Sequence, residues 1–351
     1  MLVLILWRPH PVNKVMTISF GFSTPQPIFI PLDPGKGDAL YFASLTIGTN
    51  PNPFRIIADT GSTDFWVYSS TCPTRGNKNS VNASPAPGTR TASFGYENGV
   101  TLKAGTIREV VNFGGQFLEM PFAAATEVSA SIANRPEEGV MGFARASGSR
   151  MDLPPVVDLL ALSGLIPEHV TGWKLSRGID GKNDGELVLG GVNPTKFVAQ
   201  STVTVKNLHA IDWQAPVEAA SIGNVRVIND PRVAILDTGA LYISTSFPDA
   251  EALHAFIPGA IVTPAGHYIL PCDNQAVLSL SIGGVFWPVD PRDLVDEPVP
   301  SGAGLPGYCY SSIQPDHARQ PREWLVGSAF LKNVYMILDS TENTIRIAPL
   351  R

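Results

Sequence analysis

Two copies of the tripeptide Asp-Thr-Gly are the residues in this chain most able to do chemistry. The first is Asp59-Thr60-Gly61 and the second is Asp237-Thr238-Gly239. Each copy follows a run of apolar residues. Each is also followed, at a similar distance, by two apolar residues and then a glycine. This glycine is Gly142 after the first copy and Gly327 after the second. A single Asp-Thr-Gly is typical of a β-turn, because Asp and Gly are favoured turn residues. Two copies in matching contexts instead predict a duplicated chain with one carboxylate in each half.

Two carboxylates held within hydrogen-bond reach would form an acid–base pair. Like charges that close cannot both ionise, so the pair shares one proton. The ionised member can take a proton from a water molecule while the protonated member donates to the carbonyl under attack. Such a pair hydrolyses amides without a metal, a cofactor or a covalent intermediate. We expect Asp59 and Asp237 to be this pair.

The residues beside each aspartate are expected to orient it. The hydroxyls of Thr60 and Thr238 can bond across to the opposite loop and hold the two loops together. The glycine of each motif permits a tight turn and a close approach between the loops. Ser62 can donate a hydrogen bond to Asp59, whereas the second motif ends in Ala240, which has no hydroxyl.

Short strands must position these motifs. Runs of four to seven residues rich in Val, Ile, Phe and Tyr, bounded by turn residues, predict strands. The expected strands are 41–47, 54–58, 65–68, 187–189, 201–205, 233–236 and 335–338. Helices are expected at Val156–Leu165 and Asp249–Phe256, where proline opens the segment and glycine lies near its end. Surface loops are expected at 75–90 and 296–307, which are rich in Pro, Gly, Ser and Asn.

The composition limits the class of protein. The chain has 351 residues, which is enough for about two domains, and 44% of them are hydrophobic. Its 32 glycines and 31 prolines are more than a helix bundle tolerates. The net charge of -6 argues against a nucleic-acid-binding surface. No apolar run approaches the ~18 residues of a membrane-spanning helix. We therefore expect a mostly β protein with no nucleic-acid or membrane partner.

The cysteines and histidines give no metal-binding pattern. No Cys-x-x-Cys pair exists and the six histidines are scattered, so no metal or other cofactor is expected. Cys272 and Cys309 lie in one late stretch and are the expected pair, which leaves Cys72 free. Low charge and few lysines favour an extracellular or vacuolar protein, although the apolar run at 2–7 is short for a signal peptide. In an exported chain, Asn82-Ala83-Ser84 is an N-glycosylation sequon.

From Tyr41 to Leu350 the sequence resembles the pepsin-like aspartic proteases. Besides the two Asp motifs, Phe65-Trp66-Val67 matches the segment that follows the first motif in that family. The segments 138–142 and 324–327 match the strands that cross behind each Asp loop, and Cys272 and Cys309 match the family's C-lobe disulfide.

The resemblance implies an all-β, bilobal fold in which two similar β-barrel-like lobes enclose a cleft. The expected organisation is an N-terminal extension at 1–27, an N-terminal lobe at 28–200 and a C-terminal lobe at 201–351. An extended peptide would lie in the cleft, as strand-like peptide binding requires.

The resemblance also implies a flap, the hairpin that closes over substrate in this family. Its tip matches residues 96–99, Tyr-Glu-Asn-Gly, and by that match the hydroxyl of Tyr96 would bond to Trp66 as flap support. The residues expected to contact substrate are the main-chain groups of Gly61 and Gly239, the flap residues Tyr96 and Gly99, and the primary-pocket residues Ile57 and Val140.

The sequence departs from the family pattern in several places. The early cysteine pair is missing, and Glu97 and Val100 replace the more usual flap residues. We expect no room for the family's basic pro-segment before Tyr41, so either the sequence is truncated or this member does without that segment. Both aspartates are nevertheless present. The sequence therefore predicts a monomeric aspartic endopeptidase that acts on polypeptides at acid pH and prefers large apolar residues. The alternative is a non-catalytic binding or inhibitor-like protein with the same fold, which would be expected to have lost one aspartate.

Overall fold

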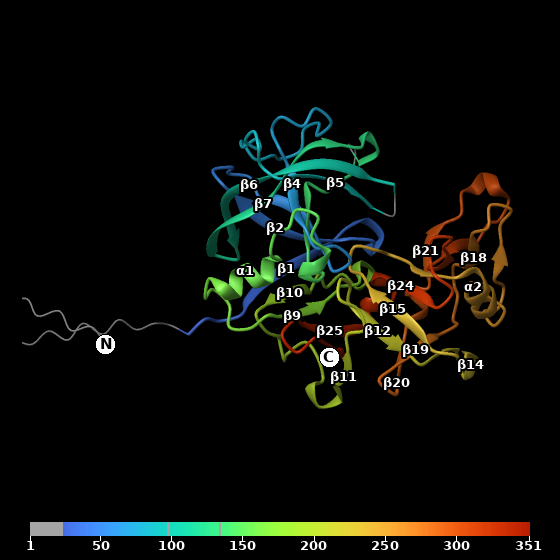
Figure 1. Cartoon of the computed structure of the whole chain (residues 1–351). Helices are drawn as coiled ribbons and strands as arrows, with labels where there is room; N and C mark the ends of the chain where they lie inside the picture. Colours follow the sequence, from blue (N-terminus) through green and yellow to red (C-terminus); the bar gives the residue numbers. More distant parts are fainter. Residues whose placement is uncertain (1–23, 97–98, 133–134) are drawn as a thin grey trace, which may run out of the picture.

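The computed structural model describes residues 24–96, 99–132 and 135–351, and most of its elements are strands (Figure 1). The largest sheet has 13 strands. Its N-terminal part contains β2 (Tyr41–Ile47), β3 (Phe54–Asp59), β8 (Gly139–Gly142), β4 (Phe65–Tyr68), β7 (Gln116–Val128), β6 (Thr101–Phe113) and β5 (Thr91–Gly95).

The other end of this sheet combines strands from both halves of the chain. In order, they are β11 (Val203–Lys206), β26 (Thr344–Pro349), β25 (Val334–Asp339), β9 (Val170–Lys174), β10 (Gly185–Leu189) and β1 (Ile28–Pro34). The antiparallel pair β9–β25 joins the two halves, and Figure 1 shows these strands below the N-terminal lobe. The chain thus has the bilobal pepsin-like fold, while the boundary between residues 200 and 201 stays a prediction.

Three smaller sheets build the C-terminal lobe. One contains β12 (Gln214–Val217), β15 (Arg232–Leu236), β24 (Glu323–Val326), β16 (Ile243–Thr245) and β23 (Ile313–Pro315). The second contains β14 (Val225–Ile228), β13 (Ala219–Ile222), β19 (Leu278–Ile282) and β20 (Val285–Pro288). The third contains β17 (Ile261–Val262), β18 (Tyr268–Pro271), β22 (Tyr308–Ser311) and β21 (Val295–Pro298).

The duplication inferred from the motifs is visible in the strand pairing. In the first half, β8 lies between β3, with which it is parallel, and β4, with which it is antiparallel. In the second half, β24 lies in the same way between β15 and β16. In each half the strand that ends at the aspartate is therefore held by the strand that carries the later apolar-apolar-glycine signature.

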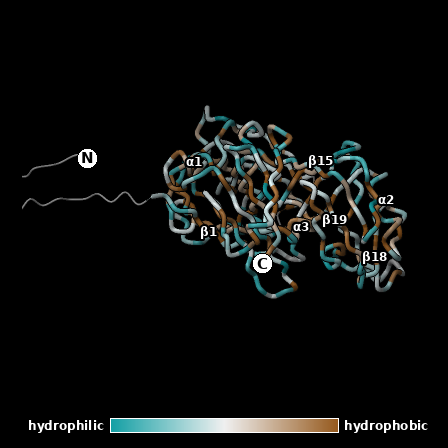
Figure 2. Tube along the Cα trace, turned by 90° about the horizontal axis from the view of Figure 1, so that it is seen from below, coloured by the Kyte–Doolittle hydropathy of each residue, from teal (hydrophilic) through white to brown (hydrophobic). Residues whose placement is uncertain are grey.

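An apolar core runs through both lobes. Residues Ile28, Ile30 and Leu32 of β1 are buried while Phe29 between them is exposed, as the two-residue period of a strand requires. The tryptophans Trp66, Trp173 and Trp324 are among the largest fully buried side chains. Figure 2 shows the hydrophobic segments concentrated inside and hydrophilic segments along the outer loops.

Several sequence predictions need correction. Helix α1 (Val156–Leu162) ends earlier than expected, because the turn at Ser163 leads into Gly164 with a φ of +68°. Helix α2 (Phe247–His254) begins two residues before the expected Asp249 and ends at His254. The segment 296–298, expected in a loop, belongs to β21, and the short helix α3 (Ser328–Leu331) was not predicted. Within the described ranges, no helix is long and apolar enough to cross a membrane.

Candidate active site

The two aspartates stand at equivalent places in the two halves. Asp59 is the last residue of β3, and Asp237 directly follows β15. The backbone N–H of Phe143, just after β8, donates to the Asp59 carbonyl oxygen at 2.7 Å. The backbone N–H of Asp237 donates to the carbonyl oxygen of Val326 in β24 at 3.0 Å. The strand behind each motif therefore fixes the backbone of its aspartate.

The glycines of these crossing strands are required by close packing. A Cβ atom on Gly142 would lie 2.5 Å from the carbonyl oxygen of Ser62. A Cβ atom on Gly327 would lie 2.5 Å from the carbonyl oxygen of Ala240. Each strand thus lies directly against the turn that follows its aspartate, and a larger residue would displace that turn.

The two motifs are tied together by the threonines. The hydroxyl of Thr60 donates to the carbonyl oxygen of Leu236 at 2.8 Å, and the hydroxyl of Thr238 donates to that of Ala58 at 2.7 Å. Each hydroxyl also accepts a hydrogen bond from the backbone N–H of the other threonine, at 3.0 and 2.9 Å. Both side chains are fully buried. The cross-bonds expected from the sequence are present, and they lock the two loops to one another rather than contacting the carboxylates.

Each carboxylate faces the motif of the opposite half. A Cβ atom on Gly239 would lie 2.5 Å from Asp59 Oδ1, and one on Gly61 would lie 2.4 Å from Asp237 Cγ. The two carboxylates therefore share one small volume at the junction of the lobes.

Hydrogen bonds within each motif orient the carboxylates. Asp59 accepts from the N–H of Gly61 at 2.8 Å and from the hydroxyl of Ser62 at 2.5 Å. Asp237 accepts from the N–H of Gly239 at 2.7 Å. The N–H groups of Gly61 and Gly239 thus donate to the aspartates of their own motifs. The expectation that main-chain groups of these glycines contact substrate stays a prediction.

A hairpin made by β5 and β6 carries the expected flap tyrosine. The indole N–H of Trp66 donates to the Tyr96 hydroxyl at 2.7 Å. Burial raises the pKa of the Tyr96 hydroxyl, and the nearby negative charge of Asp59 raises it further. Tyr96 therefore stays protonated. The backbone N–H of Gly99 donates to the Tyr96 carbonyl oxygen at 2.9 Å, while Glu97 and Asn98 lie outside the described residues.

The residues expected to line an apolar pocket lie on neighbouring strands. Ile57 in β3 and Val140 in β8 are register partners. Both are buried in an apolar cluster that includes Trp66 and against which Tyr96 packs. The predicted pocket residues and the flap tyrosine thus belong to one apolar cluster, and Ile57 lies two residues before Asp59 in β3.

Two features of the site were missed by sequence reasoning. The buried carboxylate of Asp64 accepts from the hydroxyl of Ser149 at 2.7 Å and from the N–H of Arg150 at 2.8 Å, which holds that loop beside the first motif. The sequence signal that could have revealed this role is the position of an acidic residue directly before the apolar segment 65–68. The second feature is Trp213, whose indole N–H donates to the carbonyl oxygen of Phe143.

The cysteines are arranged as predicted. Cys272, just after β18, forms a disulfide with Cys309 of β22, and Cys72 is a buried free thiol. In the part of the chain that the structure describes, no group of three or more His, Cys, Asp and Glu side chains could hold a metal ion.

Together, the duplicated strand arrangement and the facing carboxylates define the class of bilobal β proteins with an aspartate pair between their lobes. The chain belongs to the eukaryotic aspartyl protease family, whose family model matches residues 40–350. It is 28% identical to the aspartic-type endopeptidase ctsD of Aspergillus fumigatus over 319 residues. This aligned region covers 89% of this chain and 66% of that protein.

Similar proteins from other organisms cover most of the chain as well. Rhizopuspepsin of Rhizopus chinensis is 29% identical over 333 residues, which is 92% of this chain and 81% of that protein. Napsin-A of Homo sapiens is 28% identical over 365 residues, which is 95% of this chain and 85% of that protein. The chain spans only 61% of the length of the similar probable endopeptidases from Arthroderma benhamiae and Trichophyton verrucosum.

Proposed function

We propose that this chain is an aspartic endopeptidase that hydrolyses polypeptides at acid pH. The observation that carries the proposal is the packing of each catalytic carboxylate against the glycine of the opposite motif. In this arrangement the ionised aspartate takes a proton from a water molecule held between the carboxylates. The water attacks the peptide carbonyl, and the protonated aspartate donates its proton to the carbonyl oxygen. The tetrahedral intermediate then breaks down: the aspartate that took the proton from water gives it to the amide nitrogen, the C–N bond breaks, and the carbonyl re-forms as the other aspartate takes back its proton. One of Asp59 and Asp237 acts as the general base and the other as the general acid.

The surroundings of the pair support peptide binding. The N–H groups of Gly61 and Gly239 already donate to the aspartates, so we assign the substrate contacts of these glycines to their carbonyl oxygens. Tyr96 and Gly99 on the hairpin would close over the bound peptide. The apolar cluster that includes Ile57 and Val140 would favour cleavage beside large hydrophobic residues.

The same features support action as a monomer outside the reducing cytosol. One chain supplies both aspartates, so a second copy is not needed to complete the site. A disulfide and an exposed asparagine at the sequon residue Asn82 suit an extracellular or vacuolar protein.

Acid-pH digestion of a denatured protein with and without pepstatin, a general inhibitor of the family, tests the proposal. We expect pepstatin-sensitive cleavage by the wild type, and a loss of at least ~100-fold in Asp59→Asn and Asp237→Asn with unchanged melting temperature. Asp152→Asn is the control, because Asp152 forms only an exposed ion pair with Arg90. Retention of activity in either motif variant would contradict the assignment. A wild type that binds pepstatin but cleaves nothing would support the non-catalytic alternative.

A further inference from the structure

A cavity of about 250 Å³ lies beside the Asp59 motif, where the two halves of the chain meet. It is lined from the first half by Phe143, Arg145 and Asp158, and from the second half by Trp213 and Ser340. Phe143 links the cavity to the motif, because it lines the cavity and its N–H donates to the Asp59 carbonyl oxygen. The cavity has no part in the proposed hydrolysis.

One wall of the cavity carries a guanidinium in a fixed orientation. The guanidinium of Arg145 lies over the ring of Trp213, 5.2 Å from its centroid, and donates to the carbonyl oxygen of Ser340 at 3.1 Å. The ring of Trp213 is held in turn by its hydrogen bond to the Phe143 carbonyl. Among the residues that the structure describes, none provides a carboxylate partner for Arg145. Arginine is always charged and has five N–H donors, so this positive charge is not neutralised within the cavity.

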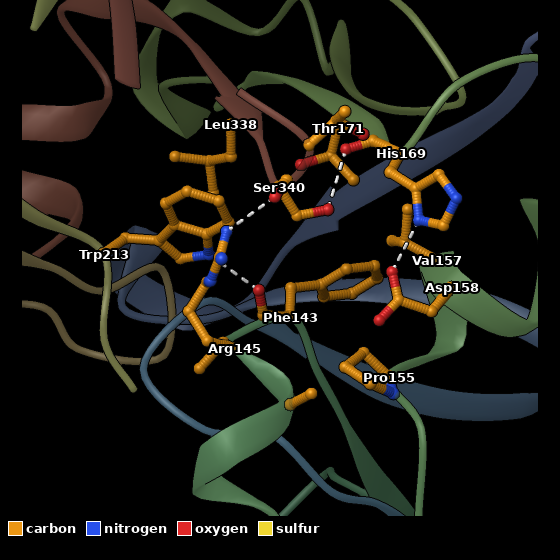
Figure 3. Close-up of a pocket in the computed structure, with 13 residues that line it drawn as sticks. Phe143, Arg145, Pro155, Val157, Asp158, His169, Thr171, Trp213, Leu338 and Ser340 are labelled. Atoms are coloured by element: carbon orange, nitrogen blue, oxygen red, sulfur yellow. Dashed lines mark hydrogen bonds and ion pairs between the residues drawn. The ribbon is translucent and has the colours of Figure 1, made fainter. Parts of the chain in front are cut away.

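The acidic group of the cavity already has a partner. Asp158, in the first turn of α1, is 2.7 Å from Nδ1 of His169. Figure 3 shows this pair at the opposite end of the cavity from Arg145 and Trp213. Asp158 therefore makes no ion pair with Arg145, and the carboxylate and the guanidinium stand at opposite ends of the cavity.

The space between these two ends has apolar walls. Phe143, Trp213 and Leu338 are almost completely buried, and each presents part of its side chain to the cavity (Figure 3). A concave surface that combines apolar rings with a few fixed polar groups is typical of a site for a small organic molecule. A guanidinium recognises a carboxylate through two parallel N–H···O bonds, which an oriented fork makes with little loss of side-chain entropy.

We propose that this cavity binds a small organic carboxylate. Arg145 holds the carboxylate group, and the rings of Phe143 and Trp213 with the side chain of Leu338 contact the apolar part of the molecule. Both contributions are needed, because a bare anion leaves the apolar walls uncovered and a neutral apolar molecule leaves the charge of Arg145 unmatched.

The test uses benzoate and its neutral isostere benzamide with the purified full chain, at low ionic strength and at a pH where benzoate is ionised. Isothermal titration calorimetry should show saturable binding of benzoate and at least ~10-fold weaker binding of benzamide, which corresponds to the loss of one charge-assisted interaction. Acetate, which lacks the apolar part, should also bind more weakly. The comparison needs only the wild-type protein, so it does not depend on a variant that folds.

Variants then locate the site. Arg145→Gln should lose at least ~10-fold in benzoate affinity, whereas Arg145→Lys, which keeps the charge but not the fork, should lose less. Arg108→Gln is the matched control, because Arg108 forms an exposed ion pair with Glu119. Near-ultraviolet circular dichroism confirms that each variant is folded. Absence of saturable benzoate binding, equal binding of benzoate and benzamide, or full affinity in Arg145→Gln would each overturn the proposal.

Discussion

Trp213 donates its indole N–H to the carbonyl oxygen of Phe143 at 2.8 Å, and this single bond connects the supports of both aspartates. On one side, the N–H of Phe143 donates to the carbonyl oxygen of Asp59. On the other side, the carbonyl oxygen of Trp213 accepts from the N–H of Leu236, the residue before Asp237, at 2.9 Å. One residue of the second half thus holds the backbone of both motifs, the first through its indole N–H and the second through its own carbonyl oxygen, in addition to the threonine cross-bonds.

We expect Trp213→Phe to lower kcat more than its loss of stability explains. The substitution removes the indole donor and leaves the buried Phe143 carbonyl oxygen without it, which costs about 1–3 kcal/mol of unfolding free energy. Trp287→Phe is a matched control, because Trp287 donates to the carbonyl oxygen of Ile282 in the C-terminal lobe. Urea unfolding and peptide-cleavage kinetics on both variants decide the point. Similar stability losses with equal kcat values would show that Trp213 is only a core residue.

Gly239 is predicted to be intolerant of even a methyl group. In Gly239→Ala the new Cβ would lie 2.5 Å from Asp59 Oδ1, so either the carboxylate or the loop must move. Because hydrolysis depends on the relative placement of the two carboxylates, we expect kcat/KM to fall by at least ~100-fold. Gly302→Ala provides the comparison, since nothing lies within 4 Å of a Cβ at Gly302. Near-normal kinetics of Gly239→Ala would mean that the two carboxylates are farther apart in solution.

The Tyr96 hydroxyl is predicted to affect turnover more than stability. It accepts the hydrogen bond from Trp66 at the end of strand β5, and in the proposed function this hairpin closes over bound substrate. Tyr96→Phe removes the acceptor and should lower kcat/KM several-fold, whereas Tyr96→Ala, which also removes the ring, should lower it much further. Melting temperatures should change little in both variants. A large drop in melting temperature with normal kinetics would instead assign Tyr96 a structural role.

The parts of the site that could be predicted from sequence are those with local patterns. An apolar strand followed by Asp-Thr-Gly fixes the position of each aspartate, and the repeat of this pattern indicated that Thr60 and Thr238 would meet. The roles of Trp213 and Asp64 depend on contacts with residues about 70 to 90 positions away, Phe143 and the 149–151 loop. No repeat or periodicity records such contacts, because they arise only when segments distant in the sequence pack together: Asp64 against a loop of its own half, and Trp213 against the other half. Strand β21 was missed for a related reason, since its pairing with β22 overrides a local sequence that favours a loop.

His254 is predicted to make the protein less stable as the pH falls. Its ring is buried, stacked on Tyr268, and bonded through Nδ1 to the carbonyl oxygen of Ala250 and through Nε2 to the hydroxyl of Ser311. Burial lowers the pKa of His254 from 6.5 to about 4, and the hydrogen bond to Ala250 opposes this shift only in part. The unfolded chain therefore takes up a proton near pH 6.5 while the folded chain does not until about pH 4.

The stability contributed by the neutral ring of His254 is therefore fully present above pH 6.5 and is lost as the pH falls to about 4. At about 1.4 kcal/mol for each pKa unit, the loss amounts to roughly 3 kcal/mol. Urea unfolding over this pH range should show that His254→Gln, which cannot titrate, has a correspondingly shallower decline than the wild type. His267→Gln, at an exposed histidine, is the control and should follow the wild type. If wild type and His254→Gln lose stability in parallel, the buried ring of His254 does not oppose protonation, and the acid sensitivity lies in the ion-paired carboxylates instead.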